Sequence, residues 1–326
     1  MNITQLLEMT VFHRASDLHL SVGYPPMLRQ NGRLQKINAP VLTADDLTSF
    51  CYQLTPPELR EQFFQQLDLD FAYQLHEVGR FRVNLFNEQR GIALVLRLIP
   101  EITPALNTYK HFEVMRKALG QPSGLVLVTG ATGSGKSTTL AAMVEYLNQK
   151  EAFHIITLED PIEFIYTGKR ALIHQREVRR DVLDFNRGLE AALREDPDII
   201  LVGELRDLST IRLALQAAET GHLVLASLHT SGAAKSLDRL IDVFPGDEKE
   251  LIRTIFAEHL TAIFHQVLWS RTEQSARELV QEILINTPAI KNLIREHKIA
   301  QIEAAMETSR QWGMQTLSQA MKELVN

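Results

Sequence analysis

The sequence predicts an α/β protein with two domains, a doubly wound parallel sheet preceded by a smaller α+β domain. Its length of 326 residues favours two domains over one. Apolar, β-branched runs at 154–159, 198–202 and 223–228 have the composition of buried strands, and helical patterns lie between them. A fourth run, 125–128, leads into a glycine-rich loop followed by a helix. Strands that alternate with helices in this way form parallel sheets.

The composition limits the classes of function. Hydrophobic residues make up 45% of the chain and charged residues 23%, as in an ordinary soluble globular protein. The formal net charge of −6 argues against a general attraction to nucleic acid or anionic membranes. Cys51 is the only cysteine, which excludes an intramolecular disulfide and a zinc site built on several cysteines. No stretch has the pattern of a signal peptide or a membrane span, so we expect a cytoplasmic protein.

The smaller domain is expected over residues 1–100. Polar and apolar residues alternate at 17–22, as they do in a half-buried strand, and Asn31-Gly32 is a hairpin signal. Residues 101–112 interrupt these patterns with prolines and polar residues, which predicts a linker. The larger domain then occupies 113–326.

A phosphate-binding loop follows the first strand of the larger domain. Residues 130–137 read GATGSGKS and fit the pattern G-x-x-x-x-G-K-[ST]. The glycines let backbone N–H groups point inward at phosphate, and the helix N-terminus adds partial positive charge. Lys136 would reach the β- and γ-phosphates of a nucleotide, and the Ser137 hydroxyl would bind Mg²⁺. The alternative is a strand-to-helix turn without a ligand, which the complete motif and its flanks disfavour.

Acids and a histidine end the neighbouring strands: Glu159 and Asp160, then Glu204, then His229. Because the carboxyl ends of parallel strands meet at the ligand-binding edge of a sheet, we expect these side chains near the loop. Glu204 or Glu159 would hold the metal shell or take a proton from an attacking water, and His229 would contact the γ-phosphate. Each residue alone has a structural explanation as a cap or a packed histidine. Together at one edge they favour a nucleotide-hydrolysing site.

Phosphoryl transfer commonly uses an additional arginine to stabilise transition-state charge. The runs 80–86 and 92–97 of the first domain are expected to pair as strands, and they carry Arg80, Arg82 and Arg97. These arginines would reach the nucleotide of a neighbouring subunit in a ring, or else form a solvated sheet face. Alternatives within the second domain are Arg194 and Arg206.

The remaining pattern is largely helical. A helix after the strand at 198–202 has Ser209 as a possible N-cap and Gly221 as its stop. From about residue 250 the tail is expected to be mainly helical, with Thr287-Pro288 as a start signal.

Seven segments carry longer motifs: 15–20, 79–84, 129–139, 155–164, 193–207, 221–245 and 289–296. Together they resemble the secretion ATPases of type II secretion and type IV pili, the GspE/PilT family, over nearly the whole chain. The third to sixth look like that family's Walker A segment, Asp box, Walker B segment and His box. The last, AIKNLIRE, resembles a tail motif of the pilus retraction members, with Lys291 in place of arginine.

The resemblance implies a RecA-like P-loop NTPase domain behind a PAS-like amino-terminal α+β domain. It also implies a homohexameric ring that hydrolyses ATP with Mg²⁺ and works on an inner-membrane pilus or secretion platform, with no nucleic acid as partner. The catalytic residues would be Glu204, Glu159, His229, Arg80 and Arg82, with Ser137 and Glu204 at Mg²⁺ through water. Nucleotide would be held by Gly130, Ala131, Thr132, Gly133, Ser134, Gly135, Lys136, Ser137, Thr138 and His222.

Three alternatives remain at this point. An assembly or type II secretion ATPase is disfavoured because those relatives often carry a four-cysteine zinc module and a further amino-terminal domain. A P-loop nucleic-acid translocase is disfavoured by the net charge of −6 and the lack of an obvious basic stripe. A nucleotide-dependent scaffold without turnover is disfavoured by the presence of both Lys136 and Glu204.

Overall fold

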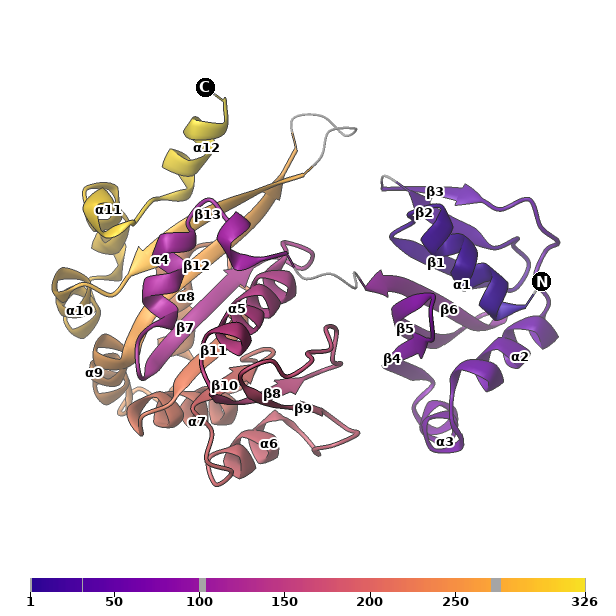
Figure 1. Ribbon diagram of the computed structural model, residues 1–326, viewed down its shortest axis with the longest axis horizontal. Helices are drawn as coiled ribbons and strands as arrows, with labels where there is room; N and C mark the ends of the chain where they lie inside the picture. The colour runs from indigo at the N-terminus through magenta and orange to yellow at the C-terminus, as the bar shows by residue number, and fades with distance from the viewer. Residues whose placement is uncertain (1, 31, 100–103, 271–276, 326) are drawn as a thin grey trace. The chain divides into compact units, whose positions relative to one another are not determined.

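The computed structural model describes residues 2–30, 32–99, 104–270 and 277–325 (Figure 1). They form two compact units. The first consists of Met1–Ile102 with Pro161–Phe164, and the second of Thr103–Asp160 with Ile165–Asn326. The expected linker at 101–112 lies outside the described residues at 101–103. The 3-10 helix η1 (Leu106–Thr108) follows, and its Leu106 is buried in the core of the second unit.

The first unit is an antiparallel six-stranded sheet with three helices, in the strand order β3-β2-β1-β6-β5-β4. Its strands are β1 (Asp17–Ser21), β2 (Met27–Gln30), β3 (Arg33–Lys36), β4 (Asp68–Leu75), β5 (Gly79–Glu88) and β6 (Gly91–Ile99). Its helices are α1 (Ile3–Phe12), α2 (Ala44–Leu54) and α3 (Pro57–Gln66). Alternate residues of β5 are buried, so this sheet buries one face, which packs with all three helices in a single core.

The sequence predicted several of these elements. The strand at 17–22 and the pairing of 80–86 with 92–97 are confirmed as β1 and as the antiparallel pair β5–β6. Strands β2 and β3 form an antiparallel hairpin. Of its predicted turn, Asn31 lies outside the described residues, while Gly32 has the positive φ of 81° that such a turn favours.

The second unit is a seven-stranded sheet in the order β13-β12-β7-β11-β10-β8-β9. Its strands are β7 (Gly124–Gly130), β8 (His154–Glu159), β9 (Leu172–Glu177), β10 (Ile199–Val202), β11 (Leu223–Leu228), β12 (Leu260–Trp269) and β13 (Glu278–Ile285). Its first helices are α4 (Phe112–Leu119), α5 (Lys136–Lys150), α6 (Phe185–Ala192), α7 (Leu208–Glu219) and α8 (Ala233–Asp242). The others are α9 (Lys249–His259), α10 (Pro288–Arg295), α11 (Ile302–Glu307) and α12 (Leu317–Val325), with the 3-10 turns η2 (Ile299–Gln301) and η3 (Arg310–Trp312).

Helices cover both faces of this sheet (Figure 1). Along β7, Leu125 and Leu127 pack into a core shared with α6 to α9, whereas Val126 and Val128 pack into a second core with α4 and α5. The expected parallel, doubly wound sheet is confirmed for β7, β8, β10 and β11. Strands buried on both faces read as continuous apolar runs, which is why the sequence revealed them.

The expectation of a mainly helical tail is confirmed for α9 to α12 but overlooked a pair of strands. Two long strands lie within it: β12 pairs in parallel with β7, and β13 pairs antiparallel with β12. The polar residues His265 and Gln266 in the middle of β12 obscured the strand pattern, although both are buried. The edge strand β9 was also missed. The predicted helix start at Thr287-Pro288 is confirmed by the capping of α10.

The N-cap of α7 is Asp207 rather than Ser209. Its carboxylate accepts from the backbone N–H of Thr210 at 2.9 Å and from the Ser209 hydroxyl at 2.5 Å. Ser209 thus lies inside the helix and supports the cap. Gly221 follows the C-cap of this helix with a φ of 107°, as predicted for its stop.

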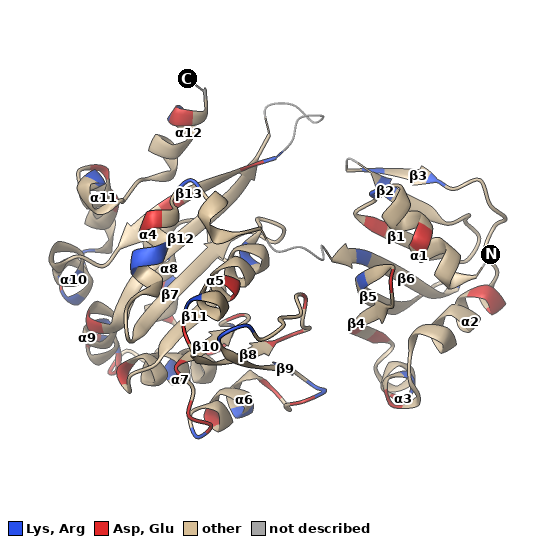
Figure 2. Ribbon diagram, in the orientation of Figure 1, with Lys and Arg blue, Asp and Glu red and all other residues tan. Residues whose placement is uncertain are grey.

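Charge is mixed over the surface of both units. Figure 2 shows acidic and basic residues interspersed along the helices, in keeping with 34 basic and 40 acidic residues in the chain. In the described ranges, no helix combines the length and apolar character that spanning a membrane would require. Within the same ranges, no group of three or more histidines, cysteines and acids is arranged to hold a metal ion.

Candidate nucleotide site

The loop between β7 and α5 has the backbone of a phosphate cradle. Gly130, Gly133 and Gly135 all have positive φ, at 144°, 77° and 89°. A Cβ on Gly130 would lie 2.5 Å from both the Gln266 carbonyl oxygen and the Ser134 Oγ, so a side chain does not fit there. Helix α5 starts at Lys136, and no side chain caps its first turn. Its first N–H groups are therefore oriented for an anion at this end of the helix.

Lys136 is folded back onto this loop and is only 8% exposed. Its Nζ donates to the carbonyl oxygens of Gly130 and Ala131, each at 3.0 Å. The same Nζ lies 3.3 Å from the Nδ1 of His229. An ammonium group can exchange such carbonyl acceptors for phosphate oxygens, which carry more negative charge.

His229 links Lys136 to Glu204. Its Nε2 lies 3.4 Å from the Glu204 carboxylate, on the side of the ring opposite the nitrogen that contacts Lys136. Burial lowers the pKa of His229, and the charge of Lys136 lowers it further, while Glu204 acts in the opposite direction. The imidazole is therefore neutral near pH 7. A neutral ring can accept at one nitrogen and donate at the other, as this position between a cation and an acid requires.

Glu204 is also bound by an arginine of its own unit. Its second carboxylate oxygen accepts from the Nε of Arg206 at 2.8 Å. Arg206 lies 3.7 Å from Asp160, so charged groups continue from β10 to the end of β8. The structure thus brings Lys136, His229, Glu204 and Asp160 to one edge of the sheet, as the strand directions predicted.

Glu159 has different neighbours. Its carboxylate accepts from the Thr157 hydroxyl at 2.7 Å and from the Gln175 amide at 3.4 Å. These partners lie on β8 and β9, which are one and two strands further from the phosphate loop than β10, the strand that Glu204 follows. Glu204 is connected to Lys136 through His229, whereas the contacts of Glu159 described above lead to β8 and β9.

Two buried residues of β12 contact the segments on either side of the phosphate loop, and the sequence prediction missed both. The Gln266 amide donates to the Thr139 hydroxyl on α5 at 2.7 Å. His265 Nδ1 lies 3.1 Å from the hydroxyl of Thr129, the residue before Gly130. Burial lowers the pKa of His265, with Lys136 acting in the same direction. Recognising β12 as the strand next to β7 would have placed them here.

The comparisons with known proteins agree with this geometry. A family model described as "Type II/IV secretion system protein" matches residues 3–326. The chain belongs to this family. It is 50% identical over 325 residues to the "Type IV pilus retractation ATPase PilT" of Pseudomonas aeruginosa, covering 100% of this chain and 94% of that protein. The "Type II secretion system ATPase E" of Vibrio cholerae is 36% identical over 255 residues, covering 74% of this chain and 49% of that protein.

A solved structure of this family has the same fold. The "Crystal Structure of the Pilus Retraction Motor PilT and Bound ADP" matches with a TM-score of 0.90 and 39% identity, covering 99% of this chain and 93% of that one. Full-length similarity to this nucleotide-bound relative, together with the loop and its neighbouring strand ends, shows that the chain is an ATPase of the secretion ATPase family.

The residues present fit a nucleoside triphosphate. The Ser134 Oγ is buried in the loop and has no hydrogen-bond partner among the described residues, so the cradle holds a polar group that the protein itself does not satisfy. Lys136 and the first-turn N–H groups of α5 supply further donors. Ser137 is exposed at the start of the same helix, where a hydroxyl can join a metal shell.

Three predicted site residues are not brought to this edge within the second unit. His222 precedes β11, at the opposite edge of the sheet, where its Nδ1 lies 3.0 Å from the Ala217 carbonyl oxygen. The geometry therefore does not support a contact between His222 and nucleotide in its own subunit. Arg80 and Arg82 belong to the first unit. Arg82 makes a bidentate ion pair with Asp70, with its shortest contact at 2.6 Å, and Arg80 donates to the Ile162 carbonyl at 2.9 Å.

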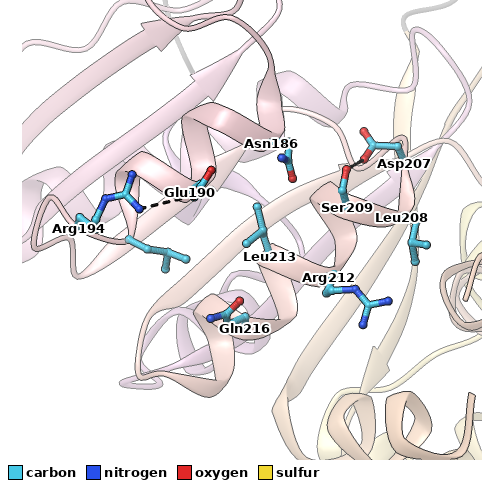
Figure 3. Close-up of a pocket in the computed structure, with 10 residues that line it drawn as sticks. Asn186, Glu190, Arg194, Asp207, Leu208, Ser209, Arg212, Leu213 and Gln216 are labelled. Carbon is cyan, nitrogen blue, oxygen red and sulfur yellow. Dashed lines mark hydrogen bonds and ion pairs between the residues drawn. The ribbon is translucent and has the colours of Figure 1, made fainter. Parts of the chain in front are cut away.

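A pocket of about 780 Å³ lies away from the phosphate loop (Figure 3). It lies between α6 and α7, and none of its lining residues belongs to the loop. Two pairs of its lining side chains interact: Arg194 contacts Glu190 at 3.7 Å, and Ser209 donates to Asp207. Arg212 instead pairs with Glu248, which does not line the pocket. This pocket and the phosphate loop are therefore separate features of the second unit.

Proposed function

We propose that this chain is an ATP-driven motor of the pilus retraction type and that it works as a homohexamer. One observation carries the proposal: Lys136, His229 and Glu204 are in contact across the ends of β7, β11 and β10. The chain that brings these three residues together matches a retraction ATPase over 100% of its own length. The type II secretion and assembly ATPases are less favoured, since the Vibrio cholerae relative is matched over only about half of its own length.

The residues at this edge of the sheet would have separate roles in hydrolysis: phosphate binding, metal binding and proton transfer. Residues 130–135, with Lys136 and Thr138, would bind the phosphates, and Ser137 and Glu204 would hold Mg²⁺, the latter through water. Bound Mg²⁺ supplies charge neutralisation at the phosphates. Glu204 would take the proton of the attacking water, and neutral His229, placed between Lys136 and Glu204, would detect the γ-phosphate.

The proposed domains are a PAS-like domain over 1–100 and a RecA-like ATPase domain over 113–326. Of the linker expected at 101–112, Leu106 packs in the core of the second unit, so the ATPase domain begins before residue 113. Arg80 and Arg82 of the first domain would act on the nucleotide of a neighbouring subunit. Because Arg82 is held by Asp70, reaching a phosphate requires that this ion pair opens. A guanidinium suits the role, since it keeps its charge and binds several oxygens at once.

The proposed setting is the cytoplasm, with attachment to the inner membrane through a pilus platform protein. A nucleic-acid partner is not expected, because the net charge is −6 and basic and acidic residues are interspersed in Figure 2.

The primary test is turnover of ATP by the purified chain. Lys136→Ala should abolish it, because the β- and γ-phosphates lose their cation. Lys150→Ala, in the exposed last turn of the same helix, is the matched control and should leave it unchanged. The native particle should contain six chains of 37.0 kDa. Wild-type protein without turnover, or full turnover in Lys136→Ala, would contradict the assignment.

Gene deletion separates the motor types. Loss of a retraction motor should leave surface pili in place and stop their retraction. Loss of the pili themselves, or of protein secretion, would favour the assembly or type II secretion alternative.

Mixing of subunits tests the arginines. Arg82→Ala should lose roughly 10³-fold in rate, as loss of an arginine finger does. Mixed with Lys136→Ala protein, it should regain activity, because some interfaces then combine an intact Arg82 with an intact Lys136. A fully active Arg82→Ala, or mixed rings that stay inactive, would rule out action between subunits.

A further inference from the structure

The position of His229 depends on the helix that follows it. Residues 229–232 connect β11 to α8, and the N-cap of α8, Gly232, provides no side chain to cap the first turn. Lys136 and Glu204 contact His229 from two sides, but both are side-chain contacts to a loop residue. The backbone of His229 is held by α8, because its carbonyl oxygen accepts from Arg239 of that helix at 2.6 Å. What fixes the start of α8 therefore also influences the distance of His229 from Lys136 and Glu204.

Glu282 caps this turn from another element. It lies on β13 and is only 8% exposed, and its Oε1 accepts from the backbone N–H of Ala233 at 3.3 Å. Its Oε2 is 3.7 Å from the point where a Cβ on Gly232 would lie, so both carboxylate oxygens lie close to the start of α8. Burial raises the pKa of Glu282, and the hydrogen bond from Ala233 opposes that rise. A carboxylate at a helix N-terminus satisfies N–H groups that the helix itself leaves unpaired.

Ser236 connects the same turn to the end of β7, just before the phosphate loop. Its hydroxyl is fully buried, 2.5 Å from that of Thr230 and 3.4 Å from that of Thr129. Thr129 contacts His265 on β12, and His265 lies directly opposite Glu282 in the β12–β13 pair. Strand β13 therefore contacts the first turn of α8 directly through Glu282, and β12 is linked to it through Thr129.

We propose that Glu282 and Ser236 are positioning residues for ATP hydrolysis, which fix the first turn of α8 so that His229 stays between Lys136 and Glu204. The inference rests on the proposed function. Neither residue belongs to the phosphate loop, so their loss should leave nucleotide binding intact. It should instead lower kcat, because His229 and Glu204 would spend less time in the productive arrangement.

The test compares Glu282→Ala with Glu282→Gln. Alanine removes the acceptor, whereas the glutamine amide oxygen can still accept from Ala233. We expect Glu282→Ala to lose about tenfold in kcat per nucleotide-binding site, with the KM for ATP and the Kd for ADP within about twofold of wild type. Glu282→Gln should recover to within about threefold. Glu278→Ala, an exposed acid on the same strand, is the matched control and should behave as wild type.

Hydrogen exchange gives a readout that needs no turnover. The amides of residues 229–236 should exchange at least about tenfold faster in Glu282→Ala than in wild type or Glu278→Ala. If wild-type protein does not hydrolyse ATP, the proposed function fails, and this exchange still decides the anchoring.

Two results would overturn the inference. One is a kcat of Glu282→Ala within about threefold of wild type, and the other is a raised KM with unchanged kcat. If Glu282→Ala does not fold, Ser236→Ala takes its place. It removes only a hydroxyl and is judged by the same loss of kcat and the same exchange.

Discussion

Replacement of Glu204 by glutamine separates binding from chemistry at the proposed site. Glutamine has nearly the shape of glutamate. Its amide oxygen can still accept from Arg206, whose Nε lies 2.8 Å from Glu204, whereas its amide N–H would face the N–H of His229, 3.4 Å away, so the contact with His229 is weakened. The hydrogen bonds from Lys136 to the carbonyl oxygens of Gly130 and Ala131 are made within the loop. The contacts around Lys136 should therefore persist, while the basic carboxylate is lost. ADP affinity should stay within about threefold of wild type.

The expected loss of rate follows from the lost proton acceptor. General base catalysis contributes about 10²- to 10⁴-fold, so kcat of Glu204→Gln should fall by a factor in that range. This corresponds to about 3–5.5 kcal/mol of transition-state stabilisation. Phosphate release measures kcat, and calorimetric titration with ADP measures binding on the same preparation.

Glu159→Gln is the matched comparison, because Glu159 is the other acid predicted to act as base. Its carboxylate is bound by Thr157 and Gln175, and glutamine preserves an acceptor for both. We expect it to lose less than about tenfold in kcat. A nearly normal rate in Glu204→Gln together with an inactive Glu159→Gln would show that the reasoning from contacts is wrong and that Glu159 is the base.

Three further predictions follow from single contacts. Gly130→Ala should weaken ADP binding and lower stability by about 1–3 kcal/mol, since φ is 144° and the new Cβ would lie 2.5 Å from a backbone oxygen; Gly246→Ala, with open space around it, should be neutral in the same urea titration. Asp207→Ala should lower the stability by about 1–2 kcal/mol by removing the cap of α7, and Ser209→Ala should lower it less; a loss in Ser209→Ala as large as that in Asp207→Ala would refute the assignment of Asp207 as the dominant cap. Burial lowers the pKa of His265 in the folded protein, so the unfolded state binds protons more readily. The contribution of neutral His265 to stability should be fully present above about pH 6.5 and should be lost as the pH falls below that value. If the melting temperature of His265→Asn falls with decreasing pH as steeply as that of wild type, His265 makes no such contribution.

The parts that the sequence predicted are those whose signal is local. The loop at 130–137 is set by glycines, a lysine and a serine at fixed spacing. Strands β8, β10 and β11 are buried on both faces and therefore appear as unbroken apolar runs. Their carboxyl ends meet at one edge because the strands are parallel, so Glu204 and His229 could be placed near Lys136 before the structure was known.

The missed parts depend on partners that are distant in the chain. His265 and Gln266 interrupt the apolar pattern of β12, and inside the protein they contact Thr129 and Thr139, which lie 136 and 127 residues away. A buried polar residue whose partner is that remote has the same local signature as an exposed one. The same holds for Glu282, which is buried at the start of a helix that precedes it by 49 residues.

The two histidines of the segment at 221–245 show how strand direction decides between similar candidates. His222 and His229 flank β11, a strand of six residues, so roughly 20 Å of extended chain separates their backbones. Leu223 pairs with Gly124 at the start of β7, and Leu228 pairs with Thr129 at its end, just before the phosphate loop. Only His229 can therefore contact Lys136 of the same chain. The motif assigns both histidines to the nucleotide. The direction of β11, which the sequence already predicted, places only His229 at the phosphate-loop end of the sheet.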